Sequence, residues 1–201
     1  MSEYERWEGR FAATDYVFGT EPNVFLAAQK DLLPKTGSAL AIADGEGRNG
    51  VWLAQQGLDV TTVDASLVGI DKARKLATSR GVAIDAIHAN LETWEWPEDR
   101  FDVIVSNPPY VAARDPHLAQ GDLRFEPRQA LTDESDDGLS SLRAIVSGAP
   151  AHLLPGGWLL VEHGYDQAEA CRNLLADAGF VDLVAVDDLA GIARVAAGRR
   201  Q

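Results

Sequence analysis

Short apolar runs alternate with segments of helical periodicity along most of the chain. The apolar runs predict seven strands, which cover residues 39–43, 60–63, 82–88, 101–105, 158–161, 181–186 and 192–197. Apolar residues at helical spacing predict helices over residues 2–11, 66–80, 139–154 and 168–178, with further helices after residues 22 and 50. Strands that alternate with helices are typical of an α/β fold with a parallel sheet, and we expect the last two strands to be antiparallel.

The most informative segment is residues 101–110, where a buried strand runs into two prolines. Its β-branched residues Val103, Ile104 and Val105 follow one another, as expected when a parallel strand is covered on both faces. The prolines lack N–H donors and end the strand. The residue before them, Asn107, therefore follows the carboxyl end of a central strand, where open α/β sheets bind their ligands.

Asn107, Pro108, Pro109 and Tyr110 have groups that can hold a planar amide or amine. The Asn107 side-chain oxygen and a prolyl carbonyl can accept hydrogen bonds from such a group, which opposes the delocalisation of its lone pair. The prolines make the turn rigid, and Tyr110 offers a flat face for stacking. A turn that merely ends the strand, without any chemistry, is the structural alternative.

A glycine-rich turn over residues 44–50 predicts a second binding element. Gly45 and Gly47 let the backbone approach a ligand closely. Asp64 follows at roughly the spacing of a ribose-binding acid, and Asn90 follows the third strand, where it can bind an adenine amino group. A plain tight connection for the glycines and a helix N-cap for Asp64 are the alternatives. No P-loop lysine follows the glycines, so a nucleoside without pyrophosphate fits better.

Two further segments have an open interpretation. Residues 16–22 form a loop before a helix with Thr20 as its expected N-cap, and this N-terminal part is either a lid over a pocket or a packing helix. Residues 111–138 form a long connection of the kind that is usually functional. We name Glu126 in that connection and Phe18 in the N-terminal loop as candidate substrate contacts, and a surface acid is the alternative for Glu126.

Composition and charge restrict the function. The net charge of −13 argues against a protein that binds phosphate backbones, so we expect no nucleic-acid partner. The single cysteine, Cys171, excludes an internal disulfide. The sequence shows no signal peptide and no apolar run long enough for a membrane span. We therefore expect a cytoplasmic enzyme without a membrane partner.

The glycine turn and the Asn-Pro-Pro-Tyr segment together resemble class I methyltransferases that depend on S-adenosylmethionine (AdoMet). Residues 1–105 resemble the small enzymes of the tellurite-resistance and thiopurine type, through residues 16–22, 45–49, 63–64 and 101–103. The chain departs from that type at two positions. Ala41 stands where the family usually has an acid, and Ala43 stands where it has a glycine. Two consequences are open: AdoMet binds more weakly, or Asp44 partly substitutes for the missing acid.

Residues 106–199 resemble the protein-glutamine N5-methyltransferases that modify peptide-release factors. The similar stretches are residues 106–110, 115–118, 121–122, 124–127, 130–131, 137–139, 156–157, 162–164 and 194–195. The resemblance implies that Asn107 and the Pro108 backbone accept hydrogen bonds from a glutamine amide while Tyr110 packs near it. Because the two resemblances meet near Ser106, we hypothesise a natural or engineered hybrid (a chimera) of two families.

The resemblance implies a Rossmann-like, seven-stranded, mostly parallel sheet with helices on both faces and an antiparallel last strand. We expect one domain over residues 1–201, with an N-terminal cover (1–37), a cofactor half (38–105), a substrate half (106–201) and no separate N-terminal recognition domain. The expected cofactor is AdoMet, with S-adenosylhomocysteine as product. Its expected contacts are Asp44, Gly45, Gly47, Asp64, Ala65, Asn90, Leu91 and Asn107.

The expected reaction is methyl transfer to a glutamine amide in a release-factor-like protein. Three alternatives remain open at this point. The chain is a methyltransferase for a small thiol or metalloid, a methyltransferase for a nucleobase amine, or a methyltransferase-fold domain with little or no activity. The absence of a basic segment that could read a nucleic acid disfavours the second alternative.

Overall fold

A seven-stranded sheet organises the computed structural model, which describes residues 3–119, 128–188 and 191–201. The strand order is β3-β2-β1-β4-β5-β7-β6. The strands are β1 (Ser38–Ile42), β2 (Asp59–Asp64), β3 (Asp85–His88), β4 (Phe101–Ser106), β5 (Leu153–Glu162), β6 (Val181–Asp187) and β7 (Ala193–Arg199). All neighbours from β3 to β5 are parallel, and β7 is antiparallel to both β5 and β6. The predicted fold class is confirmed.

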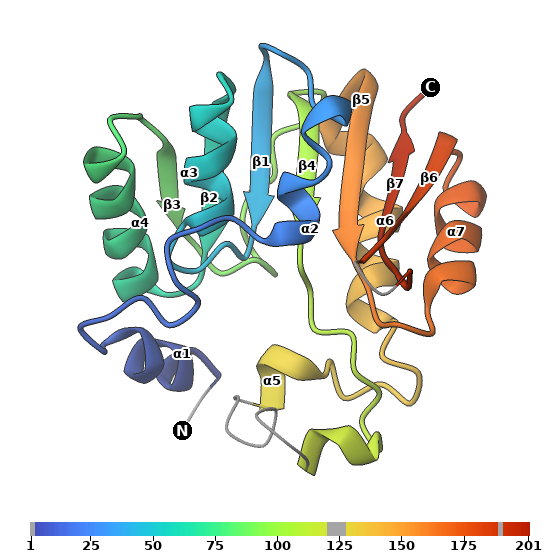
Figure 1. The fold of residues 1–201 in the computed structure, drawn as a ribbon, viewed down its shortest axis with the longest axis horizontal. Coiled ribbons are helices and arrows are strands. Elements are labelled where there is room, and N and C mark those ends of the chain that lie inside the picture. Colours follow the sequence, from blue (N-terminus) through green and yellow to red (C-terminus); the bar gives the residue numbers. More distant parts are fainter. Residues whose placement is uncertain (1–2, 120–127, 189–190) are drawn as a thin grey trace.

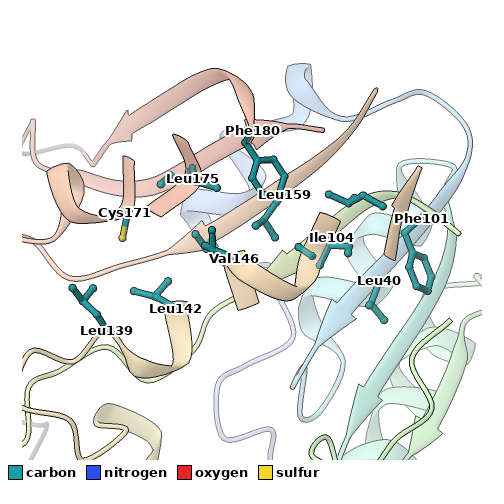
Figure 2. Packing of buried hydrophobic residues seen from close by; sticks show 14 of the residues in the cluster. Leu40, Phe101, Ile104, Leu139, Leu142, Val146, Leu159, Cys171, Leu175 and Phe180 are labelled. Atoms are coloured by element: carbon teal, nitrogen blue, oxygen red, sulfur yellow. The ribbon is translucent and has the colours of Figure 1, made fainter. Parts of the chain in front are cut away.

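Helices cover both faces of the sheet because its central strands are apolar on both sides. Leu40 and Ile104 face one layer of helices, which contains α6 (Ser140–His152) and α7 (Ala168–Asp177). Figure 2 shows this side of the core, with Leu142 and Val146 of α6 near the sheet residues. The opposite face of the sheet packs against α2 (Val24–Ala27) and α3 (Arg48–Gln55), and α4 (Leu67–Ser79) packs beside α3.

Short helices lie beyond one end of the sheet. In Figure 1, α1 (Glu3–Phe11) and α5 (Arg128–Leu131) lie past the end to which β1 points. The remaining elements are two short 3-10 helices, η1 (Lys30–Leu32) and η2 (Pro116–Ala119). Among the described residues, no helix is both long enough and apolar enough to cross a membrane.

Two local predictions differ from the structure. The N-cap of the second helix is Asn23, whose side chain accepts a hydrogen bond from the N–H of Phe25, and not Thr20. The strand predicted over residues 158–161 begins earlier, at Leu153, because Phe101 pairs with Leu153 whereas Val103 pairs with Trp158. The intervening residues of β5 bulge out of the ladder, which is how a strand accommodates extra residues.

Candidate functional site

A cavity lies at the carboxyl ends of β1 and β4, where the order in which the strands are added to the sheet changes direction. Strand β1 pairs with β2 on one side and with β4 on the other, although β2 and β3 come between them in the sequence. The connections that leave β1 and β4 therefore diverge, and such a switch point leaves a crevice at the carboxyl ends of the strands. The cavity at this place has a volume of about 1870 Å³.

Most of the residues predicted for the site line this cavity. They are Phe18, Asp44, Gly45, Asp64, Ala65, Asn90, Leu91, Asn107, Pro108, Pro109 and Tyr110. Gly47 is not among the lining residues. It caps α3 with φ of +87°, and a Cβ atom there would lie 2.5 Å from the Cβ of Ala73, so it allows α3 to pack on α4. The other candidate, Glu126, lies outside the described residues.

The glycine turn is held by a buried carboxylate. Asp44 accepts hydrogen bonds from the N–H groups of Gly50 (2.8 Å) and Asn49 (3.3 Å) and from the hydroxyl of Thr62 (3.3 Å). Burial raises the pKa of Asp44 to about 7, and the nearby Asp64 carboxylate adds to this. Asp44 therefore satisfies the free N–H groups at the start of α3, which is a helix-capping role.

Asp64 binds the end of β2 to the same turn. Its two carboxylate oxygens accept hydrogen bonds from the N–H groups of Gly45 (2.8 Å) and Ser66 (2.8 Å). Burial raises the pKa of Asp64. The alternative role as N-cap of α4 is filled by Ser66, which accepts from the N–H of Gly69. Since a carboxylate offers about four acceptor positions, Asp64 can still accept hydrogen bonds from two hydroxyls in the cavity.

The turn after β4 presents an unused amide. Asn107 is exposed, lines the cavity, and makes no side-chain hydrogen bond within the described part of the chain. Pro108, which follows it, is buried and fixes the backbone. The side-chain oxygen and N–H groups of Asn107 are therefore available to a ligand.

Tyr110 is anchored by polar residues that sequence reasoning did not select as site residues. Its hydroxyl donates a hydrogen bond to Glu162 (3.0 Å) and accepts one from Arg194 (3.0 Å). Its carbonyl accepts from the side chain of Gln167 (2.8 Å). The only signal for these partners in the sequence was that Glu162 and Arg194 lie in stretches of the release-factor-enzyme resemblance.

Comparisons with known proteins agree with this geometry. Residues 39–121 match a family model described as a methyltransferase domain. The chain has the class I methyltransferase fold. Solved structures with the same fold include a TehB-like SAM-dependent methyltransferase from Corynebacterium glutamicum, with a TM-score of 0.56 and 18% identity over 98% of this chain and 95% of that one. Another is the N-methyltransferase NodS from Bradyrhizobium japonicum in complex with S-adenosyl-l-homocysteine, with a TM-score of 0.64 and 19% identity over 98% and 97%.

Curated proteins similar to this chain include release factor glutamine methyltransferases. The release factor glutamine methyltransferase of Neisseria gonorrhoeae is 44% identical over 170 residues, which is 83% of this chain and 62% of that protein. The enzyme of the same name from Vibrio cholerae is 40% identical over 185 residues, which is 90% of this chain and 63% of that protein. The chain thus spans less than two thirds of the length of these relatives.

The comparisons do not confirm a hybrid origin for the chain. An alignment that covers 90% of the chain has to cross Ser106, where we placed the junction between two families. A single family therefore matches on both sides of that residue.

An N-terminal aromatic cluster closes one side of the cavity. Trp7, Phe11 and Phe18 all line it, and the rings of Trp7 and Phe11 stack with centroids 5.0 Å apart. A Cβ atom on Gly45 would lie 2.9 Å from the Phe11 ring, so α1 packs directly on the glycine turn. Arg48 donates to the carbonyl of Phe18 (3.2 Å) and holds the loop in place.

The opposite side of the cavity is formed by α6 and by the segment after β3. Ile145 and His152 of α6 line it together with Leu91 and Trp96. The indole N–H of Trp96 donates to the carbonyl of Leu91 (3.1 Å), which fixes that segment. The cavity is lined by apolar and aromatic side chains together with a few polar groups, as in most small-molecule sites. The described residues contain no cluster of three or more His, Cys, Asp or Glu placed to hold a metal ion.

Proposed function

We propose that the chain is an AdoMet-dependent methyltransferase that transfers a methyl group to the side-chain amide nitrogen of a glutamine in a protein. The observation that carries this proposal is the exposed Asn107 amide at the carboxyl end of β4, which has no hydrogen-bond partner among the described residues and lies close in sequence to the anchored Tyr110. The similarity to release factor glutamine methyltransferases supports the acceptor class. A release-factor-like protein is the proposed partner, and a cytoplasmic location stays a prediction.

The residues of the cofactor half suit a nucleoside. The Asp64 carboxylate has free acceptor positions for two ribose hydroxyls, and Ala65 follows it in the cavity wall. Asn90 and Leu91 line the place expected for an adenine ring. Asp44 and Gly47 act indirectly in this scheme, because they hold the glycine turn in shape. When bound, AdoMet supplies a methyl group on a sulfonium that is activated for transfer.

The residues after β4 act on the acceptor. The Asn107 side-chain oxygen and the Pro108 carbonyl accept hydrogen bonds from the two N–H groups of the amide. This opposes delocalisation of the nitrogen lone pair and aims it into the cavity. Buried Pro108 and the ring of Tyr110 exclude water from the reacting nitrogen. The protein contributes orientation and desolvation more than acid–base catalysis.

The size of the cavity supports an acceptor that is part of a larger molecule. Sites for single small ligands usually measure about 300–1,000 Å³, and this cavity measures about 1870 Å³. It therefore has room for a nucleoside cofactor and for a protein segment beside it. In this scheme, residues 38–105 supply the cofactor side, residues 106–201 supply the acceptor side, and residues 1–37 cover both.

The proposal is tested with the variant Asn107→Ala. We expect calorimetry to show micromolar binding of AdoMet and S-adenosylhomocysteine to both the wild type and the variant. Transfer of a labelled methyl group to a glutamine of a release factor should occur only in the wild type. Asn173→Ala, which changes an exposed asparagine of α7 outside the cavity, is the matched control and should keep its activity.

Three results would count against the proposal. Methyl transfer to a small thiol that survives Asn107→Ala would favour a small-molecule enzyme. Loss of AdoMet binding in Asn107→Ala would remove that residue from the acceptor role. No binding of AdoMet at millimolar concentration in the wild type would mean that the fold is kept without the activity.

A further inference from the structure

We propose that Glu162 and Arg194 are positioning residues that clamp Tyr110 and thereby fix the Asn107 amide in the cavity, and that Asn23 holds Glu162 in place. This inference rests on the proposed function, since the clamp matters only if Asn107 holds the acceptor. The four residues Asn23, Glu162, Tyr110 and Arg194 are called the Tyr110 clamp below. They come from the N-terminal segment, the end of β5, the turn after β4, and β7.

The hydrogen bonds of the clamp form one continuous chain. Arg194 donates to the Tyr110 hydroxyl (3.0 Å), which donates to one carboxylate oxygen of Glu162 (3.0 Å). The other carboxylate oxygen of Glu162 accepts from the side-chain amide of Asn23 (2.5 Å). The phenol of Tyr110 therefore bridges a carboxylate and a guanidinium, and each oxygen of Glu162 has one donor.

The carboxylate at the centre of the clamp is buried, and the residues around it are partly shielded from water. Glu162 is only 8% exposed, and Tyr110, Arg194 and Asn23 are half-buried. The Arg194 guanidinium also lies over the rings of Tyr110 (5.6 Å) and Phe25 (5.8 Å). In such surroundings an unpaired polar group is costly, so the loss of one member disturbs the others.

The chain between Tyr110 and Asn107 can transmit this restraint. The two residues are separated only by Pro108 and Pro109, whose rings fix the backbone φ angle. The Tyr110 carbonyl is held independently by Gln167 (2.8 Å). When both ends of Tyr110 are fixed, the stiff segment before it has little freedom, and the Asn107 amide keeps one orientation toward the acceptor.

Asn23 connects the clamp to the cofactor side. Its backbone N–H donates to the side-chain oxygen of Asn49 (2.9 Å), which lies in the first turn of α3 after the glycine turn. Its side-chain oxygen accepts from the N–H of Phe25 (2.8 Å), so the amide cannot rotate without losing this cap. The donor orientation of Asn23 toward Glu162 is therefore fixed.

This fixed orientation allows an exchange experiment. Glu162→Gln replaces one carboxylate oxygen by an NH₂ group. If this group faces the Asn23 NH₂ group, the hydrogen bond between them is lost. If it faces Tyr110, the hydroxyl can only accept from it, and the hydroxyl proton loses its acceptor in the clamp. Asn23→Asp alone places two carboxylates side by side. The double variant Asn23→Asp with Glu162→Gln restores one donor for each acceptor and still caps α2, because aspartate is as good an N-cap as asparagine.

The first measurement is methyl transfer at saturating AdoMet and well below the unfolding temperature. We expect each single variant to lower kcat about 10- to 100-fold, because misplacement of a reacting group by about 1 Å has effects of this size. The double variant should recover most of the wild-type kcat. AdoMet affinity should change less than about threefold in all of them, since the residue 23 N–H that binds Asn49 is retained. Glu98→Gln, which changes an exposed glutamate outside the cavity, is the control and should match the wild type.

The second measurement does not depend on activity. The side-chain amide of Asn107 is followed by NMR in protein labelled at asparagine nitrogen. We expect its signal to shift or broaden in each single variant and to return in the double variant. Arg194→Gln should disturb it as well, whereas Arg199→Gln on the same strand removes an equal charge from the exposed pair with Asp182 and should leave it unchanged.

The outcomes separate the two proposals. Single variants that unfold at lower temperature but keep kcat and the Asn107 signal would overturn the clamp and leave it a merely structural cluster. A double variant no better than the single ones would also overturn it. If the wild type methylates no glutamine acceptor, the proposed function fails, while the NMR signal still decides whether the clamp fixes Asn107.

Discussion

The Nζ atom of Lys72 lies 2.8 Å from Oε1 of Glu46, and both side chains are buried beside the glycine turn. Lys72 also donates to the carbonyls of Ala13 (2.6 Å) and Asp15 (2.8 Å), and Glu46 accepts from the N–H of Val17 (2.7 Å). One ion pair thus binds the N-terminal segment to α4 and to the turn that we assign to the cofactor. The cover over the cavity depends on this pair.

Lys72→Ala should therefore be strongly destabilising. The change leaves the Glu46 carboxylate buried without its cation, and the loss of one partner of a buried pair costs about 3–5 kcal/mol. Urea unfolding of the wild type and the variant measures this loss. Arg80→Ala is the control, because its pair with Glu21 is more exposed (34% and 78% of the two side chains), and exposed pairs contribute about 0–1 kcal/mol. If Lys72→Ala and Arg80→Ala lost the same unfolding free energy, the buried Lys72–Glu46 pair would contribute no more to stability than an exposed pair.

Gly138→Ala should disturb the acceptor side of the site. A Cβ atom at Gly138 would overlap the carbonyl oxygen of Tyr110 and lie 2.8 Å from its carbonyl carbon, and the backbone there cannot move aside easily. We expect a loss of more than about 2 kcal/mol of stability, since the left-handed backbone strain adds to the clash. Methyl transfer should fall with it.

Gly156→Ala is the matched control for Gly138→Ala. Gly156 also has a positive φ (+84°, against +67° at Gly138), but a Cβ atom there meets nothing within 4 Å. Its loss should be only the backbone strain of about 1–2 kcal/mol, with transfer unchanged. If both variants lose the same stability and Gly138→Ala stays fully active, the contact with Tyr110 has no role.

Ala43→Gly should stabilise the protein. Ala43 follows the last residue of β1 and leads into the glycine turn with φ of +52°, a backbone conformation that alanine adopts only with strain, and the residue is exposed. Relief of this strain outweighs the larger entropy of glycine in the unfolded chain, and we expect a net gain of about 0.5–1 kcal/mol in chemical unfolding. Ala41→Gly, two residues earlier in buried β1, should instead lose about 1 kcal/mol or more. A loss of stability in Ala43→Gly would be the contrary result.

Asp44 should make stability depend on pH. Its pKa is about 7 in the folded protein because of burial, against an ordinary value of 3.8. The folded state thus holds this proton more tightly than the unfolded state, so the stabilising contribution is complete below pH 3.8 and is lost as pH rises to about 7. Across this window we expect the unfolding free energy of the wild type to fall by about 2–4 kcal/mol relative to Asp44→Asn.

The measurement for Asp44 is a set of urea unfolding curves from acid to neutral pH. Asp59→Asn, which changes an exposed aspartate at the start of β2, is the charge-matched control and should follow the wild type. Parallel curves for the wild type and Asp44→Asn over the whole range would show that this carboxyl group does not titrate as described.

Local sequence was sufficient to predict the strands, most helices and the two turns that form the site. A run of β-branched residues followed by Pro108 and Pro109 fits few structures other than a buried strand that ends at the prolines. A glycine-rich segment between a strand and a helix likewise fits few structures other than a tight turn. These features are set by backbone sterics and by the hydrophobic period, which act over a few residues. The positions of Asn107 and Asp64 at the cavity follow from them.

The partners of these residues were decided only by the tertiary structure. Asn23 and Glu162 are 139 residues apart in the sequence, and Tyr110 and Arg194 are 84 apart, so no local spacing marks them as contacts. Thr20 and Asn23 are both good capping residues, and the further bonds of Asn23 to Glu162 and Asn49 favour it as the cap. Sequence determines where a strand ends, because that depends on each residue's own backbone. Which buried donor meets which buried acceptor depends on how distant segments pack, and only the folded chain decides it.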